Sequence, residues 1–400
     1  MKRLFMSAVA PLSDGKGEWL RQQVRLANEP IDLWVLRGPV IAALRVDERG
    51  TRALRAELYR GLDTIFPEAF GLDGPDAVRK LPCATRLNDL NAKVFTNTVK
   101  GLGQLSVRLK DAEILVTIRE RTAFNRQLLE KLPRLKLISQ TGRVGSHIDI
   151  EACTRLGIAV AEGGGSPHAP AELTWALIMA SMRRLPQYIG NLKHGAWQQS
   201  GLKAASMPPN FGIGMQLRGK TLGVWGYGKI GNIVAGYGRA FGMEVKVWAS
   251  ADSRERARQD GYAVFESRDE LFECSDVLTV HLRLADKTRH LVTLQDLSKM
   301  KPTALFVNTS RAELVEESAL VAALNRGRPG MAAVDVFESE PILQGHPLLR
   351  LENAVCTPHI GYVEQAGYEQ YFAAAFDNVL NFIAGTPSNL VNPEALKVHR

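Results

Sequence analysis

From about residue 111 onward, short apolar runs alternate with stretches whose apolar residues recur at helical spacing. The apolar runs are typical of buried strands, and the first of them occupy 114–118, 135–139 and 158–161. Helices are predicted between and after these runs, at 124–131, 150–156 and 171–184. Strands that alternate with helices predict βαβ units, and therefore an α/β protein with a parallel sheet.

The alternation is interrupted at 199–219, a stretch that contains Pro208-Pro209-Asn210 and several glycines. We interpret this stretch as a connection between domains. The pattern then restarts, with predicted strands at 221–225, 244–248, 277–281, 304–307, 331–336 and 354–356 and a final helix at 368–383. This second series predicts a doubly wound sheet, so two Rossmann-like α/β domains are expected.

Residues 1–66 do not share this rhythm, and no chemistry can be assigned to them. Leucines and an isoleucine are spaced as one face of a helix at Leu54, Leu58, Leu62 and Ile65, which indicates a packing surface or an oligomer contact. Lys2 and Arg3 precede the apolar stretch 4–10, an order that resembles a signal peptide. That stretch is too short and is followed at once by Pro11, so we expect a cytoplasmic protein.

Composition narrows the class of protein. The 400 residues are 45% hydrophobic and 23% charged, as in globular proteins, and no apolar run is long enough to span a membrane. The net charge is +8, but lysine and arginine are scattered, which argues against nucleic acid and favours attraction of small anions. The four cysteines are widely separated and fit reduced thiols in a cytosolic protein, and no His/Cys cluster indicates a metal.

A glycine-rich loop, Gly226-Tyr227-Gly228-Lys229-Ile230-Gly231, directly follows a predicted strand and opens a predicted helix. In this context the three glycines have separate roles. Gly226 permits the tight turn, Gly228 lets the backbone approach a pyrophosphate, and Gly231 lets the helix pack closely on the strand. The free N–H groups at the start of the helix attract the anion. The loop therefore predicts a dinucleotide cofactor.

The end of the next strand bears on the choice between NAD and NADP. A carboxylate that binds the adenosine ribose is expected there, but the chain has Ala249 and Ser250, and Asp252 comes slightly later. The missing carboxylate removes repulsion toward a 2′-phosphate, and a nearby arginine, Arg254 or Arg256, can bind one. We therefore expect NAD or NADP, with a slight preference for NADP. In the alternative, Asp252 or the backbone binds the ribose of NAD.

Three segments that each follow a predicted strand carry Arg311, Glu340 and His359. Ligands in an open α/β sheet bind at the carboxyl ends of strands, so these side chains are expected to converge beside the nicotinamide. An imidazole can exchange a proton with the substrate oxygen during hydride transfer, and a carboxylate can orient it. A guanidinium can hold a substrate carboxylate. Each residue alone has a structural explanation, but their occurrence together after a dinucleotide loop favours catalysis.

These segments read Asn308-Thr309-Ser310-Arg311, Asp335-Val336-Phe337 with Glu340-Pro341, and Thr357-Pro358-His359-Ile360-Gly361. With the glycine loop, they resemble the D-2-hydroxyacid dehydrogenase family, which includes phosphoglycerate and glyoxylate/hydroxypyruvate enzymes. The resemblance extends from about residue 72 to the C-terminus. It implies that Arg311 binds the substrate, that Glu340 assists, and that His359 is the acid/base. It also implies cofactor contacts by Lys229, Ile230, Thr309, Ser310, Asp335 and Gly361.

The earlier half resembles the family's substrate domain. Arg119 matches an arginine that faces the active site, and Gly142 and Gly145 belong to a loop that resembles the carboxylate-binding loop. In the family this loop usually reads Gly-x-Gly, and Val144 stands in place of the second glycine. Arg283 stands where proline is usual and faces either the cofactor or solvent. Glu340 argues against formate dehydrogenase, which carries glutamine there. The family's first strand falls near 69–72.

The resemblance implies a nucleotide-binding domain at 188–363, inserted into a flavodoxin-like substrate domain made of 67–187 and 364–400, with residues 1–66 as an N-terminal extension. The expected reaction is reversible reduction of a small 2-oxo acid to a D-2-hydroxy acid by a homodimer, in a cleft between the domains that closes over the substrate. The alternative is an NAD(H)-sensing transcriptional co-repressor that retains the same triad. A third possibility is a scaffold with vestigial activity.

Overall fold

The computed structural model describes residues 2–28, 30–44, 54, 57–58, 81–95, 99, 101–118, 120, 122–201, 208, 211–340, 342 and 345–398. The chain divides into two compact units, of which the first comprises Met1–Glu162 and Phe372–Arg400 and the second comprises Gly163–Tyr371. Both contain helices and parallel strands, which confirms the predicted α/β class. Among the described residues, every helix is too short or too polar to cross a membrane.

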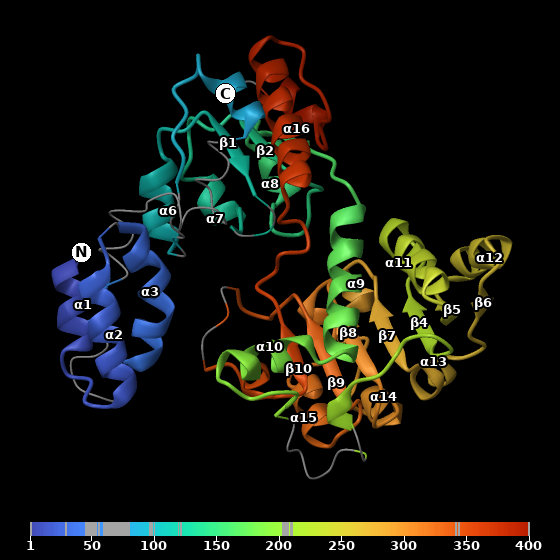
Figure 1. The fold of residues 1–400 in the computed structure, drawn as a ribbon. Helices are drawn as coiled ribbons and strands as arrows, with labels where there is room; N and C mark the ends of the chain where they lie inside the picture. Colours follow the sequence, from blue (N-terminus) through green and yellow to red (C-terminus); the bar gives the residue numbers. More distant parts are fainter. Residues whose placement is uncertain are drawn as a thin grey trace. The chain divides into compact units, whose positions relative to one another are not determined.

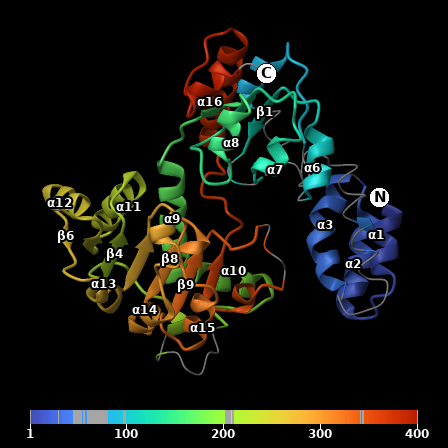
Figure 2. The ribbon, with the colours of Figure 1, turned by 180° about the vertical axis from the view of Figure 1, so that it is seen from behind.

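The first unit begins with α1 (Lys2–Val9), α2 (Gly15–Leu26) and α3 (Pro30–Ala43), which lie side by side (Figure 2). Asp14 caps α2, since its Oδ1 atom accepts a 2.7 Å hydrogen bond from the N–H of Gly17. The helices share an apolar core that includes Phe5, Ala8, Val9, Leu20, Val24, Leu33, Leu36, Val40 and Leu58. The apolar stretch at 4–10 therefore supplies the buried face of α1. Of the helix face predicted at 54–65, Leu62 and Ile65 lie outside the described residues.

The rest of the first unit surrounds a parallel sheet with the order β1-β2-β3. Its strands are β1 (Ile114–Thr117), β2 (Leu137–Gln140) and β3 (Ala159–Glu162). Its helices are η1 (Pro82–Leu87), α6 (Leu102–Leu109), α7 (Arg126–Leu129), α8 (Ile150–Arg155), η6 (Pro393–Lys397) and the part of α16 (Gln365–Ile383) from Phe372 onward. Val379 of α16 packs on the buried strand residues Leu137 and Ala161. The first strand predicted near 69–72 lies outside the described residues.

The second unit contains a seven-stranded parallel sheet with the order β10-β9-β8-β7-β4-β5-β6. Its strands are β4 (Thr221–Trp225), β5 (Glu244–Trp248), β6 (Ala263–Val264), β7 (Val277–Val280), β8 (Leu305–Asn308), β9 (Met331–Val334) and β10 (Ala354–Cys356). Every strand predicted after residue 220 has a counterpart here, and β6 is an additional one. The order changes direction between β4 and β7, which is where ligands bind in open α/β sheets.

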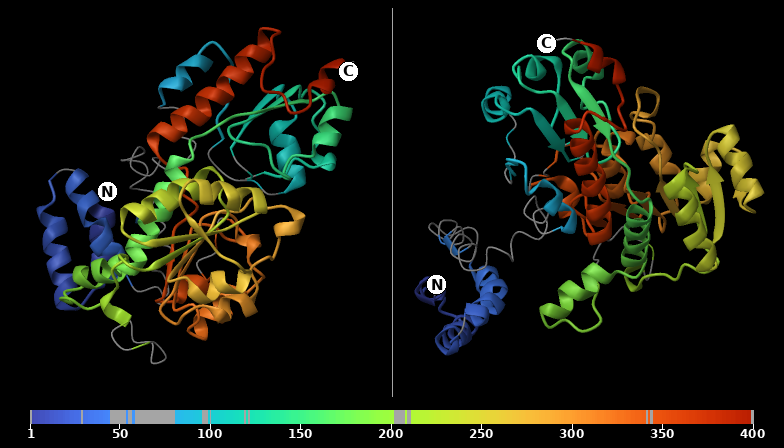
Figure 3. Two further views of the ribbon diagram at one scale, coloured as in Figure 1. Left: turned by 90° about the vertical axis from the view of Figure 1, so that its right-hand side faces the viewer. Right: turned by 90° about the horizontal axis from the view of Figure 1, so that it is seen from above.

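Helices cover both faces of this sheet (Figures 1 and 3). On one face lie α9 (His168–Met182), α11 (Lys229–Ala240) and α12 (Ala251–Gln259), and on the other lie α13 (Arg268–Cys274), α14 (Leu294–Lys299) and α15 (Ala319–Asn325). The remaining helices of the unit are α10 (Leu185–Lys193), η2 (Phe211–Ile213), η3 (Asp286–Thr288), η4 (Ala312–Leu314) and η5 (Pro347–Arg350). Strand residues alternate between the faces: Val224 packs toward α9 and α11, and Trp225 packs toward α13 and α14.

The boundary between the compact units falls between Glu162 and Gly163, because α9 packs on β8 and β9 of the second sheet. The domain boundary expected at 187/188 stays a prediction. Trp175 and Ile178 of α9 are buried in the same cluster as Val224. The periodicity of this helix shows that it is buried, but it does not show which sheet the helix covers.

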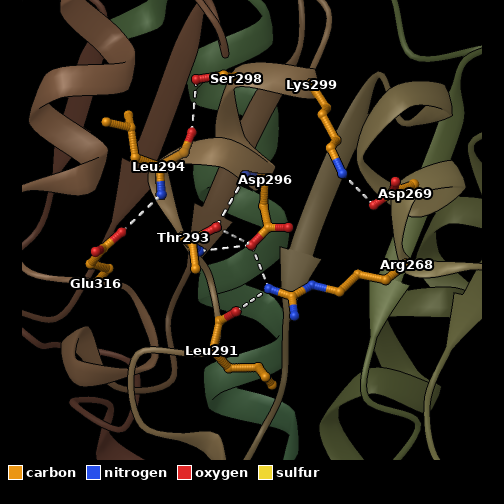
Figure 4. Close-up of polar contacts among 9 residues, drawn as sticks. All are labelled: Arg268, Asp269, Leu291, Thr293, Leu294, Asp296, Ser298, Lys299 and Glu316. Atoms are coloured by element: carbon orange, nitrogen blue, oxygen red, sulfur yellow. Dashed lines mark hydrogen bonds and ion pairs between the residues drawn. The ribbon is translucent and has the colours of Figure 1, made fainter.

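A polar network fixes α13 to α14 beneath the end of β4 (Figure 4). The guanidinium of Arg268 donates to the carboxylate of Asp296 and to the backbone carbonyl of Leu291, and it lies 5.4 Å from the centre of the Trp225 ring. Asp296 also accepts from the N–H of Thr293, at 2.8 Å, as part of the capping box of α14. One buried carboxylate thus caps a helix and neutralises an arginine next to the strand that leads into the glycine loop.

Candidate active site

The glycine loop joins β4 to α11, and each of its glycines meets a different environment. Gly226 has φ 101°, and a Cβ atom there would lie 2.5 Å from the carbonyl oxygen of His281. A Cβ atom at Gly231 would lie 2.0 Å from the carbonyl oxygen of Gly226. Gly228 is the N-cap of α11, and a Cβ atom there would meet nothing within 4 Å. The open side of the loop is therefore at Gly228, above the N-terminus of α11, where an anion is attracted.

The predicted adenosine-side residues lie where β5 runs into α12. Ser250 is the N-cap of α12, and Ala249 packs partly buried against the core. The guanidinium of Arg254 lies 4.8 Å from the centre of the Trp248 ring. Its Nε atom is buried and has no hydrogen-bond partner among the described residues. A buried donor without a partner favours binding of an acceptor, such as a phosphate oxygen.

The segment after β8 is held at the carboxyl end of the sheet by short hydrogen bonds. Ser310 donates from its hydroxyl to the carbonyl of Val280, at 2.8 Å, and the hydroxyl groups of Thr309 and Thr174 lie 2.7 Å apart. Arg311 follows, and its Nη1 atom donates to the carbonyl of Ser310 at 2.7 Å. These bonds place Thr309, Ser310 and Arg311 beyond the ends of the central strands.

The structure brings Glu340 and His359 together, although they follow different strands. The Nδ1 atom of His359 lies 2.6 Å from Oε2 of Glu340, while Oε1 accepts a 3.1 Å bond from the N–H of Phe337. The Nε2 atom of His359 is buried and has no hydrogen-bond partner among the described residues. A carboxylate at Nδ1 favours the imidazole that is protonated there, which orients the ring and leaves Nε2 available for proton exchange.

Asp335 organises the loop that carries His359. Its side chain is fully buried. The Oδ1 atom accepts hydrogen bonds from the hydroxyl of Thr357, at 2.6 Å, and from the N–H of Ile360, at 2.8 Å. The Oδ2 atom accepts a hydrogen bond from the N–H of Gly361, at 2.8 Å. Burial raises the pKa of Asp335, and these bonds oppose that rise. His359 has φ 56°, an uncommon backbone conformation that this clamp stabilises. A lone pair on Oδ2 remains for the predicted cofactor contact.

The predicted substrate residues are divided between the units: Gly142 and Gly145 lie in the first and Arg311 in the second. In the first unit, the loop 141–145 is tied to β3, because Glu162 accepts from the N–H of Val144 at 3.2 Å and pairs with Arg143 at 3.1 Å. Arg119 lies outside the described residues. The described residues contain no group of histidine, cysteine and acidic side chains that would hold a metal.

Comparison with known proteins places this site in a family. Residues 175–361 match the profile of "D-isomer specific 2-hydroxyacid dehydrogenase, NAD binding domain". The chain is 40% identical over 275 residues to a glyoxylate reductase of Aeropyrum pernix, a match that covers 68% of this chain and 81% of the relative. It is 38% identical over 259 residues to a D-3-phosphoglycerate dehydrogenase of Methanocaldococcus jannaschii, of which it covers 47%.

Among solved structures, an oxidoreductase from Ralstonia solanacearum is 66% identical, with a TM-score of 0.79 over 81% of this chain and 96% of that one. This chain belongs to the D-isomer specific 2-hydroxyacid dehydrogenase family. The predicted family and the predicted enzyme class, an NAD(P)-dependent oxidoreductase, are confirmed.

The sequence pattern did not single out His281, a residue that contacts the glycine loop of this dehydrogenase. His281 follows β7, its backbone carbonyl packs on Gly226, and its Nε2 atom lies 3.0 Å from the hydroxyl of Thr279. Burial lowers the pKa of His281 to about 4. The only available signal was its position at the carboxyl end of a predicted strand, and a single histidine there does not indicate what it contacts.

Lowering the pH is expected to destabilise the fold through His281. Its folded-state pKa lies below the unfolded value of 6.5, so the unfolded state binds more protons between pH 6.5 and about 4. The free energy of unfolding should therefore fall with decreasing pH in this window, by at most about 1.4 kcal/mol per pH unit. Urea unfolding at pH 7, 6 and 5 should show a shallower fall for His281→Gln than for wild type, and equal slopes would contradict the assignment.

Proposed function

We propose that this dehydrogenase interconverts a small 2-oxo acid and the corresponding D-2-hydroxy acid, with His359 as the acid/base. The observation that carries the proposal is the 2.6 Å contact between Nδ1 of His359 and Glu340, together with the unpartnered Nε2 atom. Glu340 holds the imidazole in one orientation and stabilises its charged form when Nε2 carries a proton. In reduction, Nε2 donates a proton to the substrate oxygen, and in oxidation it accepts one.

Arg311 binds the substrate carboxylate in this proposal. Its guanidinium offers a planar set of donors that matches two carboxylate oxygens, and this match orients the adjacent carbonyl group. The backbone N–H groups of Gly142 and Gly145 in the first unit are proposed as further carboxylate donors. The guanidinium and these N–H groups would bind the carboxylate that glyoxylate shares with larger 2-oxo acids.

The residues of the second unit fit a nicotinamide dinucleotide. We assign the pyrophosphate to the N–H groups at the start of α11, near Lys229, Ile230 and Gly231, because a Cβ atom added at Gly228 would meet nothing within 4 Å. We assign Thr309, Ser310, Asp335 and Gly361 to the nicotinamide side and Ala249, Ser250 and Arg254 to the adenosine side. When bound, the nicotinamide ring supplies or accepts the hydride.

We propose NADP as the preferred cofactor. The support comes from Arg254, whose buried Nε atom has no acceptor among the described residues, and from the uncharged pair Ala249 and Ser250. Stacking on Trp248 holds the guanidinium in place, and a 2′-phosphate would give it a charge-assisted partner.

Replacing Ala249 by aspartate is expected to shift the preference toward NADH. The new carboxylate can accept from the ribose hydroxyls of NAD and repels a 2′-phosphate. The ratio of kcat/KM for NADPH to that for NADH should fall by about tenfold or more, since a charge repulsion of about 1.4 kcal/mol suffices for that factor. Ala249→Asn is the matched control without the charge, and a ratio unchanged in Ala249→Asp would refute the preference for NADP.

The substrate is identified by purified protein, NADH or NADPH, and a panel of glyoxylate, hydroxypyruvate, pyruvate and 3-phosphohydroxypyruvate. Oxidation of the cofactor is followed by absorbance. The proposal expects turnover of at least one 2-oxo acid. The rate should be lower with the amide of the same acid, which lacks the carboxylate. Cofactor binding without turnover of any member would instead favour the co-repressor-like function.

A homodimer in the cytoplasm is a further part of the proposal. Support for a dimer comes from α10 of the second unit, which has no buried residue and exposes Leu185, Ile189 and Leu192. Exposed clusters of large apolar side chains mark protein interfaces. Sedimentation equilibrium of the purified chain should give twice the monomer mass of 44.0 kDa.

A further inference from the structure

We propose that Tyr227, Asn232, Asp260 and Arg256 are positioning residues that hold the glycine loop in the shape that receives the cofactor. This inference rests on the proposed placement of the pyrophosphate at Gly228. The four residues come from the loop, from the first turn of α11 and from α12 and its C-cap. These two helices lie side by side (Figures 1 and 3).

The hydroxyl of Tyr227 joins the two helices. It donates to Oδ2 of Asp260 at 2.7 Å and accepts from Nδ2 of Asn232 at 2.7 Å. The Tyr227 side chain is only 4% exposed, so a broken bond would not be replaced by water at low cost. Burial and the bond to Asp260 raise the pKa of Tyr227, so the phenol stays protonated and keeps donating at neutral pH.

A second connection acts on the loop backbone. The Nη2 atom of Arg256 donates to the carbonyl oxygen of Tyr227 at 3.1 Å and to the hydroxyl of Ser253 at 2.9 Å. It thereby links the loop to α12, the helix that carries Arg254, which is assigned to the adenosine side. Arg254 and Arg256 are thus distinguished by the structure, because Arg256 is already bonded to the loop, whereas the Nε atom of Arg254 has no partner in the described part of the chain.

This network has a direct consequence for binding. The loop contains three glycines, whose backbone is the most costly to order. A loop that is already ordered before the cofactor arrives avoids that cost at the moment of binding, and the affinity rises accordingly. Loss of the network should therefore weaken cofactor binding while leaving the chemical step intact once the cofactor is bound.

Tyr227→Phe tests the proposal, with Tyr262→Phe as the matched control. Tyr262 packs edge-on against Tyr227, with ring centroids 5.9 Å apart, but its hydroxyl is not part of the network. Dissociation constants for NADH and NADPH are measured by fluorescence titration, kcat at saturating cofactor by absorbance, and stability without cofactor by urea unfolding. Tyr227→Phe should raise both dissociation constants about three- to tenfold with kcat unchanged, because two hydrogen bonds are lost. Tyr262→Phe should bind as wild type.

Two further pairs of variants keep the proposal testable if Tyr227→Phe folds poorly. Asp260→Asn retains an acceptor for the Tyr227 hydroxyl and should bind the cofactor as wild type, whereas Asp260→Ala should behave like Tyr227→Phe. Arg256→Gln on the exposed face of α12 should also weaken binding, whereas Arg258→Gln on the same helix should not. Unchanged cofactor affinity in Asp260→Ala and Arg256→Gln overturns the proposal. Failure of the proposed cofactor site itself appears separately, as unchanged affinity in Gly228→Ala.

Discussion

Replacing His359 by asparagine is expected to lower kcat by about 10²- to 10⁴-fold, the range for loss of a general acid/base. Asparagine removes the Nε2 atom that is proposed to exchange the proton, but it tolerates the backbone φ of 56° at this position better than alanine does. The bonds from Asp335 to the flanking Thr357, Ile360 and Gly361 do not involve the imidazole. The loop should therefore keep its shape, and cofactor affinity and the urea midpoint should stay near wild type.

His290→Asn is the matched control for this experiment. His290 is an exposed histidine of the same unit, and it has a similar backbone φ of 53°. Its replacement makes the same chemical change at the same kind of backbone position. Because His290 is not among the residues proposed for the site, the change should leave kcat unchanged. A His359→Asn enzyme that retains more than about a tenth of wild-type kcat would refute the role of His359 as acid/base.

Alanine at Gly228 is expected to weaken binding of NADH and NADPH by about 10²-fold without destabilising the free protein. The new Cβ atom meets nothing within 4 Å in the free structure, and φ at this position is −91°, which any residue adopts. The free energy of unfolding should change little, because the lower conformational freedom of the unfolded chain is offset by the poorer capping of α11 by alanine. In the complex, the same methyl group would lie in the space proposed for the pyrophosphate against the helix N-terminus, and a displacement of about 1 Å is costly.

Gly231→Ala should give the opposite pattern. Its Cβ atom would lie 2.0 Å from the carbonyl oxygen of Gly226, so the free protein must shift before it can accommodate the methyl group. Overpacking of this kind costs about 1–3 kcal/mol of folding free energy. Fluorescence titration and urea unfolding of both variants separate the two effects. Equal cofactor affinity in wild type and Gly228→Ala would place the pyrophosphate elsewhere.

Much of this molecule is encoded locally. The alternation of apolar runs and helical stretches predicts the strands of both sheets, because side-chain periodicity reflects secondary structure over a few residues. The glycine loop is recognisable for the same reason, since a strand, a tight turn and a helix N-terminus follow one another directly in the chain. The short helices α12, α13 and α14 leave no clear periodic pattern in the sequence. Caps such as Ser267 and Thr293 stabilise α13 and α14, and a cap depends on a single residue and not on a repeating pattern.

The sequence by itself determined the α/β class, the order of the family motifs and the position of the glycine loop. Only the tertiary structure decided that α9 covers the second sheet, that Glu340 contacts His359, and that Asp335 clamps the loop around this histidine. It also brought Asp260 to Tyr227, which is 33 residues away in the chain. The physical reason is the same for these four contacts. Each contact joins segments that are distant in the chain. Whether two such segments meet depends on the order of the strands and on which helices cover each face of the sheet, and local periodicity does not specify either.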